Sequence, residues 1–163
     1  MTGERIPVAE PDISSLEIDY VTQAVKSGWV SSLGEYLDTF ELEVARFAGV
    51  PHAFAVSNGT AALFMSLKAA GVGPGDEVIV PSLTFVATAA SVLHVGATPV
   101  FVDCNELDGT MCPLAVEQAV TPRTRAVIPV HLYGVPAPMN EIIRIADAHR
   151  IVVIEDCAQA HGA

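Results

Sequence analysis

Positive charge is scarce in this sequence of 163 residues, because only eight Lys and Arg residues face nineteen Asp and Glu residues. The basic residues form no patch, so we do not expect nucleic acid as a partner. Cysteine is rare too, and Cys104, Cys112 and Cys157 have no CxxC spacing. This argues against a disulfide framework and a zinc site. Since no apolar leader opens the sequence, we expect a cytoplasmic protein with reduced thiols.

Charge of either sign is absent between Val78 and Val102, a length that would span a bilayer. Pro81, Gly96 and Pro99 interrupt this run, and hydroxyl residues dilute it. We therefore interpret it as a buried strand, a helix and a second strand, and we expect no membrane insertion. The hydrophobic content of 51% instead predicts apolar surface that is covered by another chain, or by sequence that is absent here.

From Pro51 onward, short apolar runs alternate with helical stretches. This alternation is typical of βαβ crossovers and predicts an α/β fold with a mostly parallel sheet. Residues 1–50 are expected to form an extended arm, Met1–Asp12, and two helices, and residues 51–163 a separate βα domain. The predicted strands are Ala53–Ser57, Glu77–Pro81, Pro99–Asp103, Ala126–Val130 and Ile151–Glu155. The predicted helices are Ile13–Ser27, Glu35–Phe47, Thr60–Ala70, Phe85–His94, Pro113–Val120 and Met139–Arg150.

Two carboxylates follow the last apolar run, which reads IVVIEDCAQAHGA from Ile151 to Ala163. Ligands of open α/β sheets bind beyond the carboxyl ends of the strands. Glu155 and Asp156 are therefore expected at the floor of such a crevice, with Gln159 one turn further on. An acidic pair in that place needs a cationic partner, a metal or a protonated ligand nitrogen.

Metal binding by His131, Asp156 and His161 would require a ligand spacing that this sequence does not have. We therefore predict no metal site. A single His after a strand is more often a hydrogen-bonded structural residue than a catalytic one, and we interpret His131 in that way.

An anion site is indicated where Ser57-Asn58-Gly59-Thr60 opens a helix, because free backbone N–H groups and the helix dipole attract negative charge there. The equally weighted alternative is that Ser57 or Asn58 simply caps the helix. The stretch matches neither GxGxxG nor the Walker sequence, which disfavours a Rossmann dinucleotide site and a P-loop.

Phe85 is expected at the same sheet edge, where its ring would stack on a planar ligand, although most Phe residues belong to the core. An anion cradle, a stacking ring and a carboxylate together suit a flat, phosphorylated aromatic with a ring nitrogen. Pyridoxal 5′-phosphate (PLP) fits this description. Its ring acts as an electron sink when an acidic residue keeps the pyridine nitrogen protonated, which would give the carboxylate a function.

The sequence also resembles the DegT/StrS-type sugar aminotransferases, and the matching motifs occur in the family's order from about Gly28 to Ala163. The resemblance is carried by NGTAAL at Asn58–Leu63, PSLTFVATA at Pro81–Ala89, GATPVFVD at Gly96–Asp103, PVHLYG at Pro129–Gly134 and EDCAQAHGA at Glu155–Ala163. It implies a three-layer α/β/α domain like the large domain of aspartate aminotransferase. It also implies a PLP-dependent transaminase that takes an amino-acid donor and a keto sugar linked to a nucleotide, and that works as a homodimer.

The resemblance further implies roles for individual residues. Gly59, Thr60 and Ala61 would hold the cofactor phosphate, and Phe85 would stack on the ring. Asp156 would pair with the pyridine nitrogen, and Gln159 would contact the ring hydroxyl. Trp29 would contact the substrate, because the loop at this position lies next to the substrate in proteins of the family.

The family's Schiff-base lysine and its small C-terminal domain lie beyond Ala163, so the resemblance implies a fragment that is inactive alone. Lys26 and Lys68 are the lysines present, and neither matches the family's catalytic lysine. The alternative is a non-catalytic binding or dimerisation module of the same fold. A different PLP enzyme of this fold, acting on amino acids, is disfavoured by the TFVATA and EDxAQAxGA patterns.

Overall fold

The computed structural model describes residues 10–163, so residues 1–9 of the predicted arm Met1–Asp12 lie outside it. The chain folds as two compact units, one ending at Ala55 and the other formed by Val56–Ala163. The division falls a few residues after position 50, where the pattern of the sequence changes.

The first unit contains α1 (Ser15–Ser27) and α2 (Glu35–Ala48). Ser14 and Glu17 form a capping box that begins α1, and the Ser14 hydroxyl lowers the pKa of Glu17. The hydroxyl of Tyr36 on α2 donates a hydrogen bond to Oε1 of Gln23 on α1 at 2.9 Å. Both helices were predicted within two residues of their observed ends.

The described residues of the second unit form a four-stranded sheet whose order is β2-β1-β3-β4, with every neighbouring pair parallel. The strands are β1 (Glu77–Pro81), β2 (Thr98–Val102), β3 (Thr124–Val127) and β4 (Val152–Val153). The helices are α3 (Gly59–Ala69), α4 (Ala87–His94), α5 (Pro113–Ala119) and α6 (Met139–His149), with a 3-10 turn at Leu132–Gly134.

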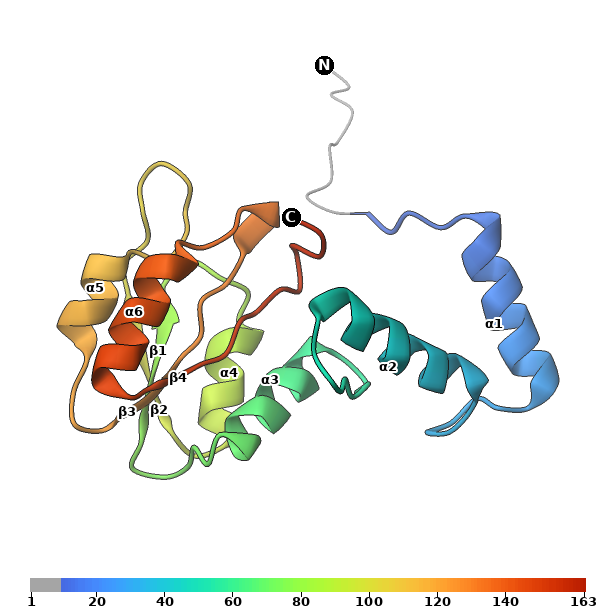
Figure 1. The fold of residues 1–163 in the computed structure, drawn as a ribbon, viewed down its shortest axis with the longest axis horizontal. Helices are drawn as coiled ribbons and strands as arrows, with labels where there is room; N and C mark the ends of the chain where they lie inside the picture. The colour runs from blue at the N-terminus through green and yellow to red at the C-terminus, as the bar shows by residue number, and fades with distance from the viewer. Residues whose placement is uncertain (1–9) are drawn as a thin grey trace, which may run out of the picture. The chain divides into compact units, whose positions relative to one another are not determined.

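Side chains alternate between two apolar clusters, one on each face of the sheet. Val78 and Val80 point into the cluster that includes residues of α3 and α4, whereas Ile79 points into the cluster that includes residues of α5 and α6. Figure 1 shows α3 and α4 covering one face and α5 and α6 covering the other. The predicted three-layer α/β/α architecture is therefore confirmed.

The segment Ala53–Ser57 was predicted as a strand, and this is wrong, because it has no strand structure. The backbone N–H of Ala55 donates to the Glu41 side chain at 2.8 Å instead of to a neighbouring strand. The side chain of Phe54 is 84% exposed, so the apolar run does not enter a core. The prediction rested on apolar character alone, and within residues 10–163 this segment has no neighbouring strand to pair with.

The charge-free run from Val78 to Val102 forms β1, α4 and β2, as predicted. All five residues of β1 are buried, and so are Thr88, Ser91 and Val92 of α4. Within residues 10–163, the helices are too short or too polar to cross a bilayer.

A buried carboxylate links the beginning of β1, one of the two inner strands, to the segment before β3. Glu77 is 7% exposed, and its carboxylate accepts hydrogen bonds from the Thr121 hydroxyl and from the Arg123 guanidinium. The Thr121 hydroxyl, and after it Arg123, holds the pKa of Glu77 below its ordinary value of 4.5. A carboxylate whose pKa is lowered by folding stabilises the fold above its unfolded pKa, and that contribution is lost as the pH falls through the lower folded pKa.

We therefore expect Glu77→Gln to lower the free energy of unfolding at pH 7, with a difference from wild type that shrinks as the pH falls below about 4.5. Denaturant unfolding at a series of pH values measures this difference. Glu117→Gln, which changes an exposed carboxylate on α5, is the matched control and should leave stability unchanged. A pH-independent difference for Glu77→Gln would show that the ion pair is not its cause.

Candidate functional site

A cavity of about 390 Å³ opens beyond the carboxyl ends of the strands, in the second unit. It is lined by the first turn of α3 and by the loops that follow β1, β3 and β4, as expected for an open α/β sheet. Among the described residues that line the cavity, Asp156 alone has a charged side chain. The lining residues are Asn58, Gly59, Thr60, Leu63, Thr84, Phe85, Ala87, Val130, Leu132, Asp156, Ala158 and Gln159.

The first turn of α3 presents backbone donors to this cavity. Oδ1 of Asn58 accepts the N–H of Ala61 at 2.9 Å, so Asn58 is the helix cap. The N–H groups of Gly59 and Thr60 have no hydrogen-bond partner within residues 10–163. Capping and anion binding are therefore compatible at this turn. The cap uses the N–H of Ala61 and leaves the N–H groups of Gly59 and Thr60 at the positive end of the helix dipole.

Asp156 is held at the cavity from both sides of its carboxylate. Oδ2 accepts the hydroxyl of Thr88 at 3.1 Å, and Oδ1 accepts the N–H of Ala158 at 3.2 Å. The backbone of Asp156 pairs with Val130 in a parallel bridge that extends the sheet beyond β3 and β4. This half-buried carboxylate is therefore placed by the sheet and oriented by two donors.

Gln159 reaches the same cavity with its amide orientation fixed. Oε1 of Gln159 accepts the backbone N–H of Tyr133 at 2.9 Å, which leaves the amide NH₂ as its available donor. Tyr133 adopts a left-handed backbone conformation (φ 53°, ψ 30°), which is strained for a side chain with a Cβ. Strain of this kind is found at ligand sites, where the surrounding structure holds it in place.

Phe85 lines the cavity and is 69% exposed, so its ring is available to a ligand instead of being buried in the core. Gly59, Thr60, Asp156 and Gln159 share this cavity with it, whereas Ala61 is not among the lining residues. Five of the six predicted cofactor residues thus surround one space. An anion, a flat ring and a protonated nitrogen all find complementary groups there.

Trp29 belongs to the first unit, where its side chain is 61% exposed. It lines a cavity of about 650 Å³ between the loop after α1 and the beginning of α2. Lys26, Ser31 and Tyr36 line the same space. The indole is therefore accessible within its own unit.

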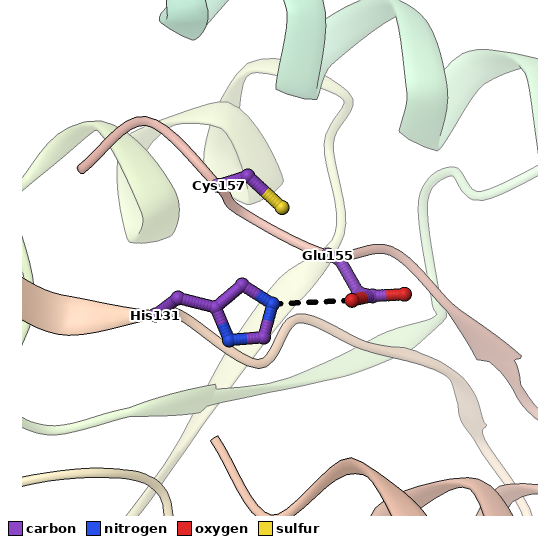
Figure 2. Close-up of side chains that lie close together, drawn as sticks. All are labelled: His131, Glu155 and Cys157. Atoms are coloured by element: carbon purple, nitrogen blue, oxygen red, sulfur yellow. Dashed lines mark hydrogen bonds and ion pairs between the residues drawn. The ribbon is translucent and has the colours of Figure 1, made fainter. Parts of the chain in front are cut away.

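His131, Glu155 and Cys157 lie close together beside the main site, with one potential ligand atom from each within 4.8 Å of the others (Figure 2). Nδ1 of His131 accepts the backbone N–H of Ala137 at 2.9 Å, so the ring proton is on Nε2. Nε2–H donates to Glu155 at 3.1 Å. A metal at Nε2 would move the proton to Nδ1, against the N–H of Ala137, so the cluster suits a structural hydrogen bond better than a metal.

Cys157 is the third member of this cluster. Burial, and after it the negative charges of Glu155 and Asp156, raise the pKa of the Cys157 thiol. The protonated thiol is a poor metal ligand and a weak nucleophile. The three cysteines of the chain are free thiols.

Thr84, Thr88 and Tyr133 contribute to the site but were not predicted. Oγ1 of Thr84 lies 3.0 Å from Oγ1 of Thr88, and Thr88 in turn contacts Asp156. Thr84 lies in the bend before α4 and Thr88 in its first turn, so helical spacing does not explain their contact, and the sequence carried no simple signal for it. The conformation of Tyr133 left no signal in the sequence either.

These features define an α/β protein with a candidate ligand site at the carboxyl edge of a parallel sheet. The chain belongs to the DegT/DnrJ/EryC1/StrS aminotransferase family, whose model matches residues 11–163. It is 48% identical to the GDP-perosamine synthase of Caulobacter vibrioides over 159 residues, which cover 98% of this chain and 43% of that protein.

Solved structures agree with this assignment. DesV of Streptomyces venezuelae superposes with a TM-score of 0.85 at 47% identity, over 91% of this chain and 40% of DesV. The PLP form of the Streptococcus pneumoniae protein Spr1654 superposes with a TM-score of 0.90 at 33% identity, over 98% of this chain and 44% of Spr1654. The chain therefore spans well under half the length of the relatives that it matches.

The hydrogen bonds of His131 predict that its neutral ring carries the proton on Nε2. The ¹⁵N chemical shifts of the ring nitrogens distinguish the two tautomers, and the exposed ring of His52 serves as an internal reference. We expect the His131 signals to stay in place when Zn²⁺ is added. A proton on Nδ1, or a stoichiometric Zn²⁺ shift at His131 and Cys157, would contradict the structural interpretation of this cluster.

Proposed function

We propose that the cavity of the second unit binds PLP, and that the chain forms the PLP-binding part of an aminotransferase acting on a keto sugar linked to a nucleotide. The observation that carries the proposal is the meeting of Gly59, Thr60, Phe85 and Asp156 around one cavity. In this assignment residues 1–50 are the N-terminal arm and helices, and residues 51–163 are the first part of the PLP-binding domain.

The donors and acceptors of the cavity fit PLP group by group. The free N–H groups of Gly59 and Thr60 would bind the phosphate at the positive end of α3, and the Thr60 hydroxyl would add a donor. A Cβ added at Gly59 would meet no atom within 4 Å, so the space in front of this turn is open to a ligand. The N–H of Ala61 already donates to Oδ1 of Asn58, so it could reach the phosphate only as a hydrogen bond shared with that oxygen.

The remaining contacts concern the ring. Asp156 would accept a hydrogen bond from the protonated ring nitrogen, and the aromatic face of Phe85 would cover one side of the ring. The amide NH₂ of Gln159 would donate to the ring hydroxyl oxygen, because its Oε1 is held by Tyr133. When bound, PLP supplies an electron sink for amino-group transfer.

The substrate class is supported by the relatives. GDP-perosamine synthases, and a transaminase for dTDP-3-amino-3,4,6-trideoxy-alpha-D-glucose from Streptomyces venezuelae at 51% identity, are named for nucleotide-linked amino sugars. We therefore assign a keto sugar nucleotide as the acceptor and an amino acid as the amino donor. Trp29, exposed beside a cavity of the first unit, is the proposed substrate contact.

A homodimer in the cytoplasm is the proposed setting. Large apolar side chains that are more than half exposed support a partner chain, among them Phe54, Val86, Phe101 and Leu114. The three free cysteines support a reducing compartment.

Pyridoxamine 5′-phosphate (PMP) tests the site directly, because it lacks the aldehyde of PLP and does not react with lysines elsewhere. We expect saturable binding to the chain, and about tenfold weaker binding or worse for Asp156→Asn, which removes a charge-assisted hydrogen bond. Glu155→Gln is the matched control, since Glu155 is the adjacent carboxylate and does not line the cavity. Fluorescence titration measures both constants, and equal losses in the two variants would contradict the role of Asp156.

The chain tested alone should not catalyse transamination, because the residues of the second unit that line the cavity include no lysine. Lys26 lines the cavity beside Trp29, and Lys68 lies near the end of α3. Borohydride reduction in the presence of PLP, followed by peptide mapping, is the measurement. Turnover of a keto sugar nucleotide, or a site-specific adduct on Lys26 or Lys68, would overturn this expectation.

A further inference from the structure

Three side chains form a continuous line of hydrogen bonds from the loop after β1 to the end of the sheet. Oγ1 of Thr84 lies 3.0 Å from Oγ1 of Thr88, and Oγ1 of Thr88 lies 3.1 Å from Oδ2 of Asp156. Thr84 and Asp156 line the cavity, whereas Thr88 is fully buried behind it. The contact between Thr88 and Asp156 joins residues 68 positions apart in the sequence.

The direction of these hydrogen bonds follows from the chemistry of the groups. An ionised carboxylate only accepts, so the single hydroxyl proton of Thr88 is donated to Asp156. Thr88 can then only accept from Thr84, whose proton points away from the cavity. The other oxygen of Asp156 accepts the N–H of Ala158 at 3.2 Å, so each carboxylate oxygen has a donor on a different segment.

We infer that Thr88 is a positioning residue: its buried hydroxyl holds the carboxylate of Asp156 in the orientation in which it meets a protonated ring nitrogen in the cavity. This inference rests on the proposed function. Ala158 lies two residues from Asp156 in the same loop after β4, so its N–H follows the backbone of that loop. Thr88 is fixed by α4, which packs in the apolar core of the second unit. The donor on the packed helix, and not the one in the loop of Asp156 itself, is therefore the group that sets the orientation of the carboxylate.

The buried position of Thr88 explains why a hydroxyl is needed there. A Val side chain would fill the same volume but would leave one oxygen of Asp156 and the hydroxyl of Thr84 without their partner. A Ser side chain would keep the donor and lose only a methyl group. Ser91 provides the control, because its buried hydroxyl lies one turn further along α4 and donates only to the carbonyls of Ala87 and Thr88.

The test compares Thr88→Val, Thr88→Ser and Ser91→Ala in the full 163-residue chain with two measurements. Three-bond couplings to the carboxyl carbon of Asp156 report whether its side chain occupies one rotamer in the ligand-free protein. Titration with PMP, and with an analogue that carries carbon in place of the ring nitrogen, reports the contact to that nitrogen. Thr88→Ala repeats the loss of the hydroxyl with a good helix former, in case Thr88→Val does not fold.

We expect wild type, Thr88→Ser and Ser91→Ala to show one Asp156 rotamer and to prefer PMP over the analogue. Thr88→Val should show averaged couplings, about tenfold weaker PMP binding and nearly unchanged binding of the analogue. A single rotamer in Thr88→Val, unchanged PMP binding, or an equal loss in Ser91→Ala would overturn the inference.

The two measurements separate this inference from the proposed function. If wild type binds neither PMP nor the analogue, the proposed function fails, and the inferred role toward a ring nitrogen fails with it. The couplings then still establish whether Thr88 holds the carboxylate of Asp156. If wild type prefers PMP and Thr88→Val keeps that preference, the proposed function stands and the inference fails.

Discussion

Two backbone hydrogen bonds at the end of the sheet determine where the acidic side chain of the site stands. The N–H of Asp156 donates to the carbonyl of Pro129 at 2.9 Å, and the N–H of His131 donates to the carbonyl of Asp156 at 3.1 Å. They continue the parallel pairing of β3 and β4 beyond the last regular strand residues. The register of this pairing turns Asp156 toward the cavity and leaves Glu155 to His131.

The rest of the site depends on the same edge. Parallel strands end together, so the loops after β1, β3 and β4 meet the first turn of α3 around one space. The two apolar clusters hold the helices against the sheet, and α4 brings Thr88 to the carboxylate. In the proposed site few charged groups are needed, because backbone N–H groups and hydroxyls would do much of the binding.

The layered fold was predictable because its signals are local. The Val78-Ile79-Val80 run identifies a buried strand, and the Gly and Pro residues between such runs mark the turns. The end of the last apolar run placed Asp156 at the edge of the sheet. Ala53–Ser57 was mistaken for a strand because an apolar run carries no information about a pairing partner.

The supporting contacts were not predictable for a related reason. The bonds of Thr88 to Asp156 and of Tyr133 to Gln159 join segments that are far apart in the sequence. Each depends on how a helix or turn packs against the end of the sheet, which no single stretch of sequence determines. The Tyr133 conformation is a further case, since a left-handed tyrosine follows from its surroundings and not from its own preference.

The central claim is that α3 and the end of the sheet form one binding site for PLP. The most direct test is a ¹⁵N–¹H correlation spectrum of the chain during titration with PMP. The account predicts that the amide signals of Gly59, Thr60 and Ala158 shift together with a single dissociation constant. Shifts confined to the loop around Trp29, or no saturable shift at these three amides, would contradict it.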